Sequence, residues 1–113
     1  MGAKAIAQIH IDKRRYPRRR FASIATVYGS KTIQAQAIEL SEGGMMLRSK
    51  TKLSLSSIVL VHFTIPEGKI QAQGRVIYSK PTEENPDFDY IGIRFTNISE
   101  LERLSIKKFV QAG

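Results

Sequence analysis

The 113-residue sequence contains no cysteine, which excludes disulfide bonds, a thiolate nucleophile and cysteine-ligated metals. Histidine is almost as scarce, since only His10 and His62 are present. No apolar run approaches the length of about 20 residues that a membrane-spanning helix needs. The first eleven residues also lack the pattern of a secretory signal. These absences predict a cytoplasmic protein without membrane insertion.

Residues suited to catalysis are few. No glycine-rich phosphate loop opens a helical pattern, and no set of serine, histidine and acid stands out from random placement. His62 lies on the polar side of an apolar strand pattern and is expected at the surface. Asp87 and Asp89 are expected to be solvated carboxylates in a turn-rich loop, because no further oxygen ligands follow at a recognisable spacing. The sequence therefore predicts no enzyme activity, no metal site and no cofactor.

Positive charge is concentrated in one segment. Six of the ten residues of Asp12–Phe21 are lysine or arginine, and removing residues 12–20 would lower the net charge from +8 to +3. Pro17 excludes a regular helix in this segment. We expect residues 1–20 to form a flexible basic arm. Such an arm is either a solvated tail with nonspecific polyanion contacts or a grip for a phosphate-bearing ligand.

The rest of the chain, residues 21–113, has mainly the alternation of β-strands. Six short strands without intervening helices predict an all-β, antiparallel barrel that is closed or nearly closed. The strands are expected at residues 21–28, 33–40, 45–49, 58–65, 69–78 and 90–95.

Two details of these strands bear on the site. Alternation fails near Ala37 and Ile38, which predicts a β-bulge. Later, the pattern from Ile70 to Val76 continues to Tyr78, so Tyr78 is expected to point inward with the apolar set.

The C-terminal segment has a helical period. Ser99 and Glu102 match a capping box, which predicts a helix start. We expect the helix to pack against the barrel or cover one end of it. The apolar face is expected to consist of Ile98, Leu101, Leu104 and Phe109.

Two arginines in the arm, Arg14 and Arg18, stand four residues apart around Tyr16 and Pro17. A guanidinium group is planar and offers forked donors, so it can pair with a phosphate or with guanine O6 and N7, and it can stack on a base. Arginines in this arrangement can close on one ligand from different directions.

Together with the later segment Glu39-x-Ser41-x-x-Gly44, this Arg14-x-x-x-Arg18 spacing resembles the two-part signature of the PilZ domain, the bacterial receptor module for cyclic di-GMP. The strand segments 74–78 and 90–95 also resemble that domain, and the likeness covers about residues 12–110. Arg15 and Arg19 match the first half-motif too.

This resemblance implies a six-stranded antiparallel split barrel with a C-terminal α-helix, and an arm that folds over bound nucleotide. It implies that cyclic di-GMP is the ligand of a site whose residues are Arg14, Arg18, Glu39, Ser41 and Gly44, with Lys13, Arg15 and Gly43 as further contacts. The family has Asp or Asn where this chain has Glu39. Glutamate keeps the acceptor for guanine N–H groups but carries one more methylene.

Three functions follow from these observations. The first is a cyclic di-GMP receptor whose ordered arm changes a surface offered to a protein of the motility, pilus, secretion or transcription machinery. The second is a PilZ-like adaptor that has lost nucleotide binding through Glu39. The third, a nucleic-acid-binding small barrel, is disfavoured because Tyr28, Tyr78 and Tyr90 are scattered in the sequence.

Overall fold

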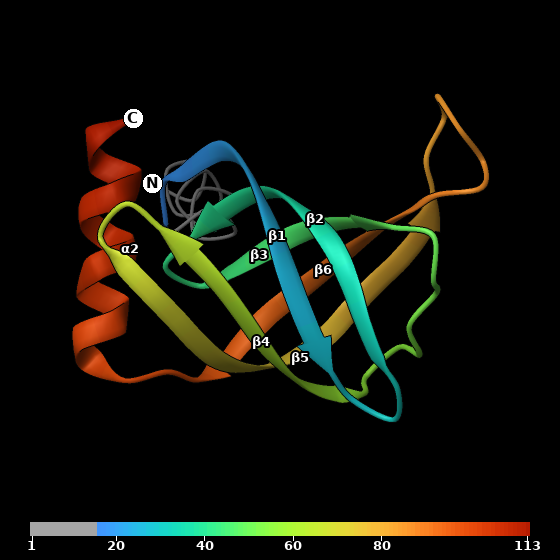
Figure 1. Cartoon of the computed structure of the whole chain (residues 1–113), viewed down its shortest axis with the longest axis horizontal. Helices are drawn as coiled ribbons and strands as arrows, with labels where there is room; N and C mark the ends of the chain where they lie inside the picture. Colours follow the sequence, from blue (N-terminus) through green and yellow to red (C-terminus); the bar gives the residue numbers. More distant parts are fainter. Residues whose placement is uncertain (1–15) are drawn as a thin grey trace, which may run out of the picture.

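Six antiparallel strands close into a barrel, and one helix lies across an end of it (Figure 1). The computed structural model describes residues 16–113. The elements are β1 (Arg18–Tyr28), β2 (Thr32–Ser41), β3 (Gly44–Ser49), β4 (Ile58–Ile65), β5 (Gly68–Pro81), β6 (Asp89–Asn97) and α2 (Glu100–Ala112).

Around the barrel the strand order is β1-β2-β3-β6-β5-β4, and every neighbouring pair is antiparallel. The closing pair is short, since β1 and β4 join only through Thr26–Tyr28 and Leu60–His62. The predicted six-stranded antiparallel barrel with a C-terminal helix is confirmed. Strand β1 starts at Arg18, three residues earlier than the sequence pattern suggested.

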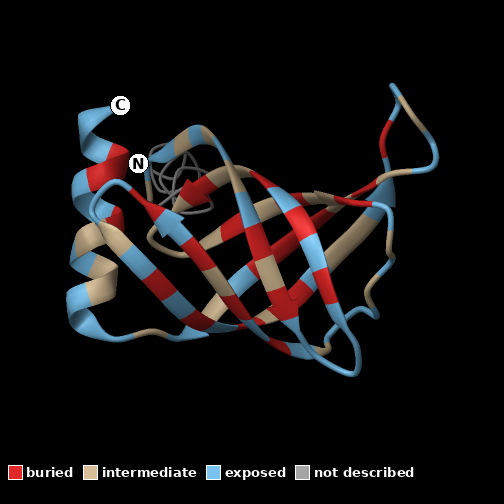
Figure 2. Cartoon of the chain, viewed as in Figure 1, coloured by how far each residue is buried: buried red, intermediate tan, exposed pale blue. Residues whose placement is uncertain are grey.

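Alternating residues of each strand fill the interior (Figure 2). On β4 the inward face is the predicted one, with Val59, Val61, Phe63 and Ile65 all buried. Branched aliphatic side chains dominate the interior, as expected where strands bury one face. The largest fully buried side chains are Leu40, Leu47, Ile70, Ile91, Ile93, Ile106, Val27, Val61 and Val76.

Bulges interrupt this alternation at two places that matter below. On β2 the pairing with β3 shifts between Ala37 and Glu39, so the predicted bulge is confirmed, with Ile38 as its extra residue. On β5 the pairing with β6 shifts between Val76 and Tyr78, which makes Ile77 an extra residue. Val76 stays buried, whereas Tyr78 lies opposite Gly92 on the outer wall. The inward orientation predicted for Tyr78 is therefore wrong.

Helix α2 begins at the predicted cap. The Ser99 hydroxyl oxygen accepts a hydrogen bond from the Glu102 amide, and the Glu102 carboxylate accepts one from the Gln71 amide of β5. The last two turns of the helix pack on the barrel through Ile106, Phe109 and Val110.

Leu101 and Leu104, predicted on the packed face, are instead 79% and 41% exposed. Residues 106, 109 and 110 share one helical face, and their burial turns the two leucines away from the barrel. The sequence pattern of the first helical turns alone does not reveal which face of the helix packs on the barrel.

A pair of truncations on α2 tests this packing. Ile106→Ala should lower the free energy of unfolding by about 2–5 kcal/mol, because it removes a fully buried side chain. Leu101→Ala is the matched control on the same helix and should change it by less than about 0.5 kcal/mol. Urea denaturation of both variants measures the difference, and equal losses would contradict the observed helix face.

Candidate functional site

The pairing of neighbouring strands arranges the residues of the outer barrel wall in rows that run from strand to strand. Residues directly opposite one another on neighbouring strands share a face. One such row runs from Arg18 on β1 through Ser41 on β2 and Gly44 on β3 to Arg94 on β6. Arg18, the described arginine of the first half-motif, therefore lies beside Ser41 and Gly44 of the second half-motif.

A second row lies beside the first. It runs from Arg20 on β1 through Glu39, Met46 and Gly92 to Tyr78 on β5. The bulges at Ile38 and Ile77 place Glu39 and Tyr78 in this row, since each lets the following side chain face outward. Glu39 and Tyr78 thus reach the same wall from strands that are far apart in the sequence.

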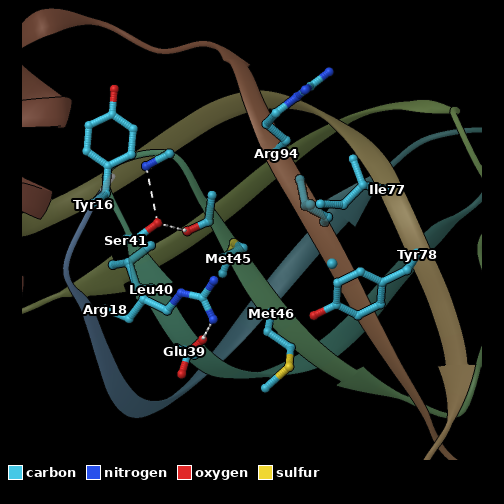
Figure 3. Close-up of a pocket in the computed structure, with 14 residues that line it drawn as sticks. Tyr16, Arg18, Glu39, Leu40, Ser41, Met45, Met46, Ile77, Tyr78 and Arg94 are labelled. Carbon is cyan, nitrogen blue, oxygen red and sulfur yellow. Dashed lines mark hydrogen bonds and ion pairs between the residues drawn. The ribbon is translucent and has the colours of Figure 1, made fainter. Parts of the chain in front are cut away.

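A cavity of about 490 Å³ opens over these two rows (Figure 3). Five of the predicted site residues line it, namely Arg18, Glu39, Ser41, Gly43 and Gly44. The remaining three, Lys13, Arg14 and Arg15, lie outside the described residues. Residues that the sequence analysis did not assign to the site also line the cavity: Tyr16, Leu40, Met45, Met46, Ile77, Tyr78, Gly92, Ile93 and Arg94.

At one edge of the cavity Arg18 and Glu39 form an ion pair, with 3.4 Å between Nη1 of the arginine and Oε1 of the glutamate. The Arg18 side chain is 51% exposed and that of Glu39 is 27% exposed. A pair this open to solvent contributes roughly 0–1 kcal/mol. Breaking this ion pair so that each group contacts a ligand instead would therefore cost little free energy.

The turn between β2 and β3 is bridged by hydrogen bonds of the Ser41 hydroxyl. The Gly43 amide donates to Ser41 Oγ at 3.2 Å, and the Ser41 hydroxyl donates to the Gly44 carbonyl at 3.4 Å. A Cβ at position 44 would collide with the Ile93 carbonyl oxygen of β6, and one at position 43 would come within 2.8 Å of the Tyr16 ring. Position 44 therefore accepts only glycine, because the obstacle is backbone, whereas a side chain at position 43 would displace the Tyr16 ring.

Tyr78 supplies an aromatic wall that the sequence analysis missed. Its ring lies against Gly92, where a Cβ would overlap it, and its hydroxyl is directed toward Met46 and Glu39 (Figure 3). Burial raises the pKa of Tyr78, the Glu39 carboxylate raises it further, and Arg18 acts in the opposite direction. The break in alternation at Val76-Ile77-Tyr78 was the available signal in the sequence.

The neighbouring arginine, Arg19, faces the other way. Its Nη1 donates to the Phe109 carbonyl at 2.7 Å, and its guanidinium lies 4.1 Å from the centre of the Phe109 ring. Arg19 therefore attaches β1 to α2, whereas Arg18 faces the cavity. This geometry favours Arg18 over Arg19 as the second arginine of the motif.

Helix α2 is also tied to the turn that carries the motif. Arg103 forms ion pairs with Glu42, at 3.0 Å, and with Glu100, at 2.7 Å. The Glu42 side chain is only 11% exposed and lies between Ser41 and Gly43 in the sequence. The hydrogen bonds that Arg103 donates to the Glu100 carboxylate, together with the charges of Glu100 and Glu42, raise the pKa of Arg103 above its ordinary value.

Two residues considered for other chemistry have structural surroundings. Asp89 was expected in solvent but is buried, and it accepts a hydrogen bond from the Ser79 hydroxyl at 2.9 Å, with Lys52 at 3.6 Å. His62 faces outward as expected but is half-buried beneath the Tyr28 ring, at 4.8 Å between ring centres. Within residues 16–113, no cluster of three or more histidine, aspartate or glutamate side chains is arranged to hold a metal.

The helix in this part of the chain is too short and too polar to cross a membrane.

Comparison with solved structures supports the fold. The Bacillus subtilis inhibitor of motility MotI/DgrA matches with a TM-score of 0.80 at 11% identity, over 88% of this chain and 50% of that one. The PilZ domain of YcgR from Escherichia coli, solved with c-di-GMP, matches with a TM-score of 0.68 at 16% identity, over 88% and 90%. The K. pneumonia MrkH–c-di-GMP complex matches with a TM-score of 0.69 at 20% identity, over 88% and 50%.

This chain thus spans about half the length of the MotI/DgrA and MrkH chains, but 90% of the YcgR domain. No curated protein sequence matches it. The model of the PilZ domain family matches residues 12–112, which is nearly the whole sequence. Arg18 of the first half-motif and Glu39, Ser41 and Gly44 of the second line one wall of the barrel, and on the family match the chain belongs to the PilZ domain family.

Proposed function

We propose that this chain binds cyclic di-GMP in the cavity on the outer wall of its barrel and, on binding, changes a surface offered to a partner protein. One observation carries the proposal. Arg18, Glu39, Ser41 and Gly44 come from three strands and line a single cavity of about 490 Å³. The YcgR domain and MrkH were both solved with c-di-GMP, which supports the same ligand for this chain.

In the proposed complex, the ligand replaces the Arg18–Glu39 ion pair. The Arg18 guanidinium turns to a phosphate or to guanine O6 and N7, and charge-assisted hydrogen bonds of this kind are about twice as strong as neutral ones. The freed Glu39 carboxylate accepts hydrogen bonds from guanine N–H groups. The bulge at Ile38 adjoins Glu39 and gives the backbone room to accommodate the extra methylene.

Tyr78 and Met46 would receive the flat face of a guanine. They lie side by side on the outer wall, and the Tyr78 ring occupies the space over Gly92 (Figure 3). An aromatic ring and a polarisable thioether both make favourable contacts with a planar π-system. The cavity then offers cation, acceptor and apolar surface to one nucleotide.

The arm completes the proposed site. Lys13, Arg14 and Arg15 precede Tyr16, whose ring packs on Gly43 at the rim of the cavity. Arg14 stands only two residues before Tyr16 in the sequence, so the proposal assigns it to the same ligand. We propose that bound nucleotide neutralises these cations and draws the arm over the cavity, and that the new face is what a protein of the motility, pilus, secretion or transcription machinery recognises.

A second candidate function is an adaptor that binds no nucleotide. The observation in its favour is the Arg18–Glu39 pair itself, because the longer carboxylate already reaches the arginine across the cavity edge. The adaptor would act through protein contacts alone.

The nucleic-acid alternative finds less support. Outside the cavity, Arg48 covers the ring of Phe88 at 3.9 Å, and the ring of Tyr28 packs against His62. The nearby loop adds carboxylates, including Glu84, which accepts from the Tyr90 hydroxyl. Aromatic faces free for base stacking on a cationic sheet are therefore scarce here.

The first test removes the arginines. Arg14→Ala or Arg18→Ala should weaken cyclic di-GMP binding by about 2 kcal/mol or more, because each removes charge-assisted contacts. Isothermal titration calorimetry measures this. Lys31→Ala, the same charge change on an exposed residue outside the cavity, is the control and should bind like wild type. Wild-type affinity in both arginine variants would identify the arm as a solvated tail.

The second test concerns Glu39 and separates the receptor from the adaptor. If Glu39 contacts guanine, Glu39→Asp should bind similarly or modestly tighter, and Glu39→Ala should lose about 1–3 kcal/mol by leaving polar partners unpaired. Binding that occurs only in Glu39→Asp, and not in wild type, would instead establish the adaptor. No effect of either change would make Glu39 a bystander.

A further inference from the structure

Arg94 on β6 sits at the far end of the row that begins with Arg18. It lines the cavity, is exposed, and extends outward on the side opposite Arg18 (Figure 3). Neither half of the family signature includes it. Its surroundings differ from those of the other arginines on this wall.

The residue directly opposite Arg94 on β5 is another arginine, Arg75. Like charges directly opposite one another destabilise a sheet. Arg75 donates to the Ser56 carbonyl at 3.0 Å. Because a carbonyl group is neutral, this hydrogen bond does not compensate the charge of Arg75. Within residues 16–113, ion pairs to carboxylates involve Arg18, Lys52 and Arg103, and neither Arg75 nor Arg94 is among them.

Neighbouring cations on the wall do have partners. Arg18 pairs with Glu39, Arg48 covers Phe88, and Lys80 approaches Tyr78. Arg94 at the cavity and Arg75 opposite it on β5 are two cations with no carboxylate partner within residues 16–113, so positive charge is concentrated beside the cavity. An anion bound there would relieve their repulsion, so the site gains more from a phosphate than an isolated arginine would.

The spacing suits a ligand held from both ends. Arg18 and Arg94 are separated by three strand-to-strand steps, or about 14 Å between their backbones. Each guanidinium can reach roughly half that distance along an extended side chain. Between them lie Ser41, which has a small side chain, and Gly44, which has none to block the approach.

We propose that Arg94, with Arg75 behind it, binds a phosphate group of the ligand from the side of the cavity opposite Arg18. This inference rests on the proposed function, because the anion is a phosphate of cyclic di-GMP. It adds a second cationic group on β6 to the contacts made by the arm. A ligand with two phosphates would then be held by cations from two sides of the barrel wall.

Calorimetric titration of the full chain with cyclic di-GMP tests this, using wild type, Arg94→Gln and Arg48→Gln. We expect Arg94→Gln to lower the affinity at least tenfold, and Arg94→Lys to recover part of it by restoring charge without the fork. Arg48→Gln is the matched control, since it removes a cation from the same wall outside the cavity. It should bind within about twofold of wild type.

Thermal unfolding of the same variants excludes a folding defect. Arg94→Gln should melt at the same temperature as wild type or higher, because it removes a like-charge pair. Wild-type affinity in Arg94→Gln would overturn the role of Arg94 and leave the proposed function intact. A wild-type chain that binds no cyclic di-GMP while Arg94→Gln folds normally would overturn both.

Discussion

In a closed barrel, successive side chains of a strand point alternately into the core and onto the outer wall. The cavity depends on the two positions where a bulge interrupts this alternation. Bulges at Ile38 and Ile77 shift the register of β2 and β5 by one residue. Each one keeps the apolar side chains of its strand buried while turning the next polar or aromatic residue outward. Without these bulges Glu39 and Tyr78 could not share a wall with Arg18.

The cations around this wall divide into a fixed set and an exchangeable set. Arg19 is held by the carbonyl and ring of Phe109, and Arg103 by two carboxylates, so both attach α2 to the parts of the chain that carry the motif. Arg18 and Arg94 are solvent-exposed, and only Arg18 has a carboxylate partner among the described residues. A rigid frame with loosely held cations at its rim is the arrangement that a charged ligand can reorganise.

The sequence predicted those features that follow from local patterns, and missed those that depend on register and packing. Strand β4, the bulge at Ile38 and the Ser99 cap were correct because each has a short-range signal. Tyr78 was placed inside because continuing the alternation from Ile70 hides a one-residue bulge.

Other errors have similar causes. Leu101 was placed on the packed face because a helix with apolar residues on several sides does not reveal which side meets the barrel. Arg94 drew no attention because its partner Arg75 is adjacent only through the β5–β6 pairing.

The most direct measurement of the central claim is amide hydrogen exchange of the full chain with and without cyclic di-GMP. The account predicts added protection in residues 12–20 and in the turn at residues 41–44, with little change on β4. Binding that leaves both segments unprotected, or that protects β4 instead, would contradict it.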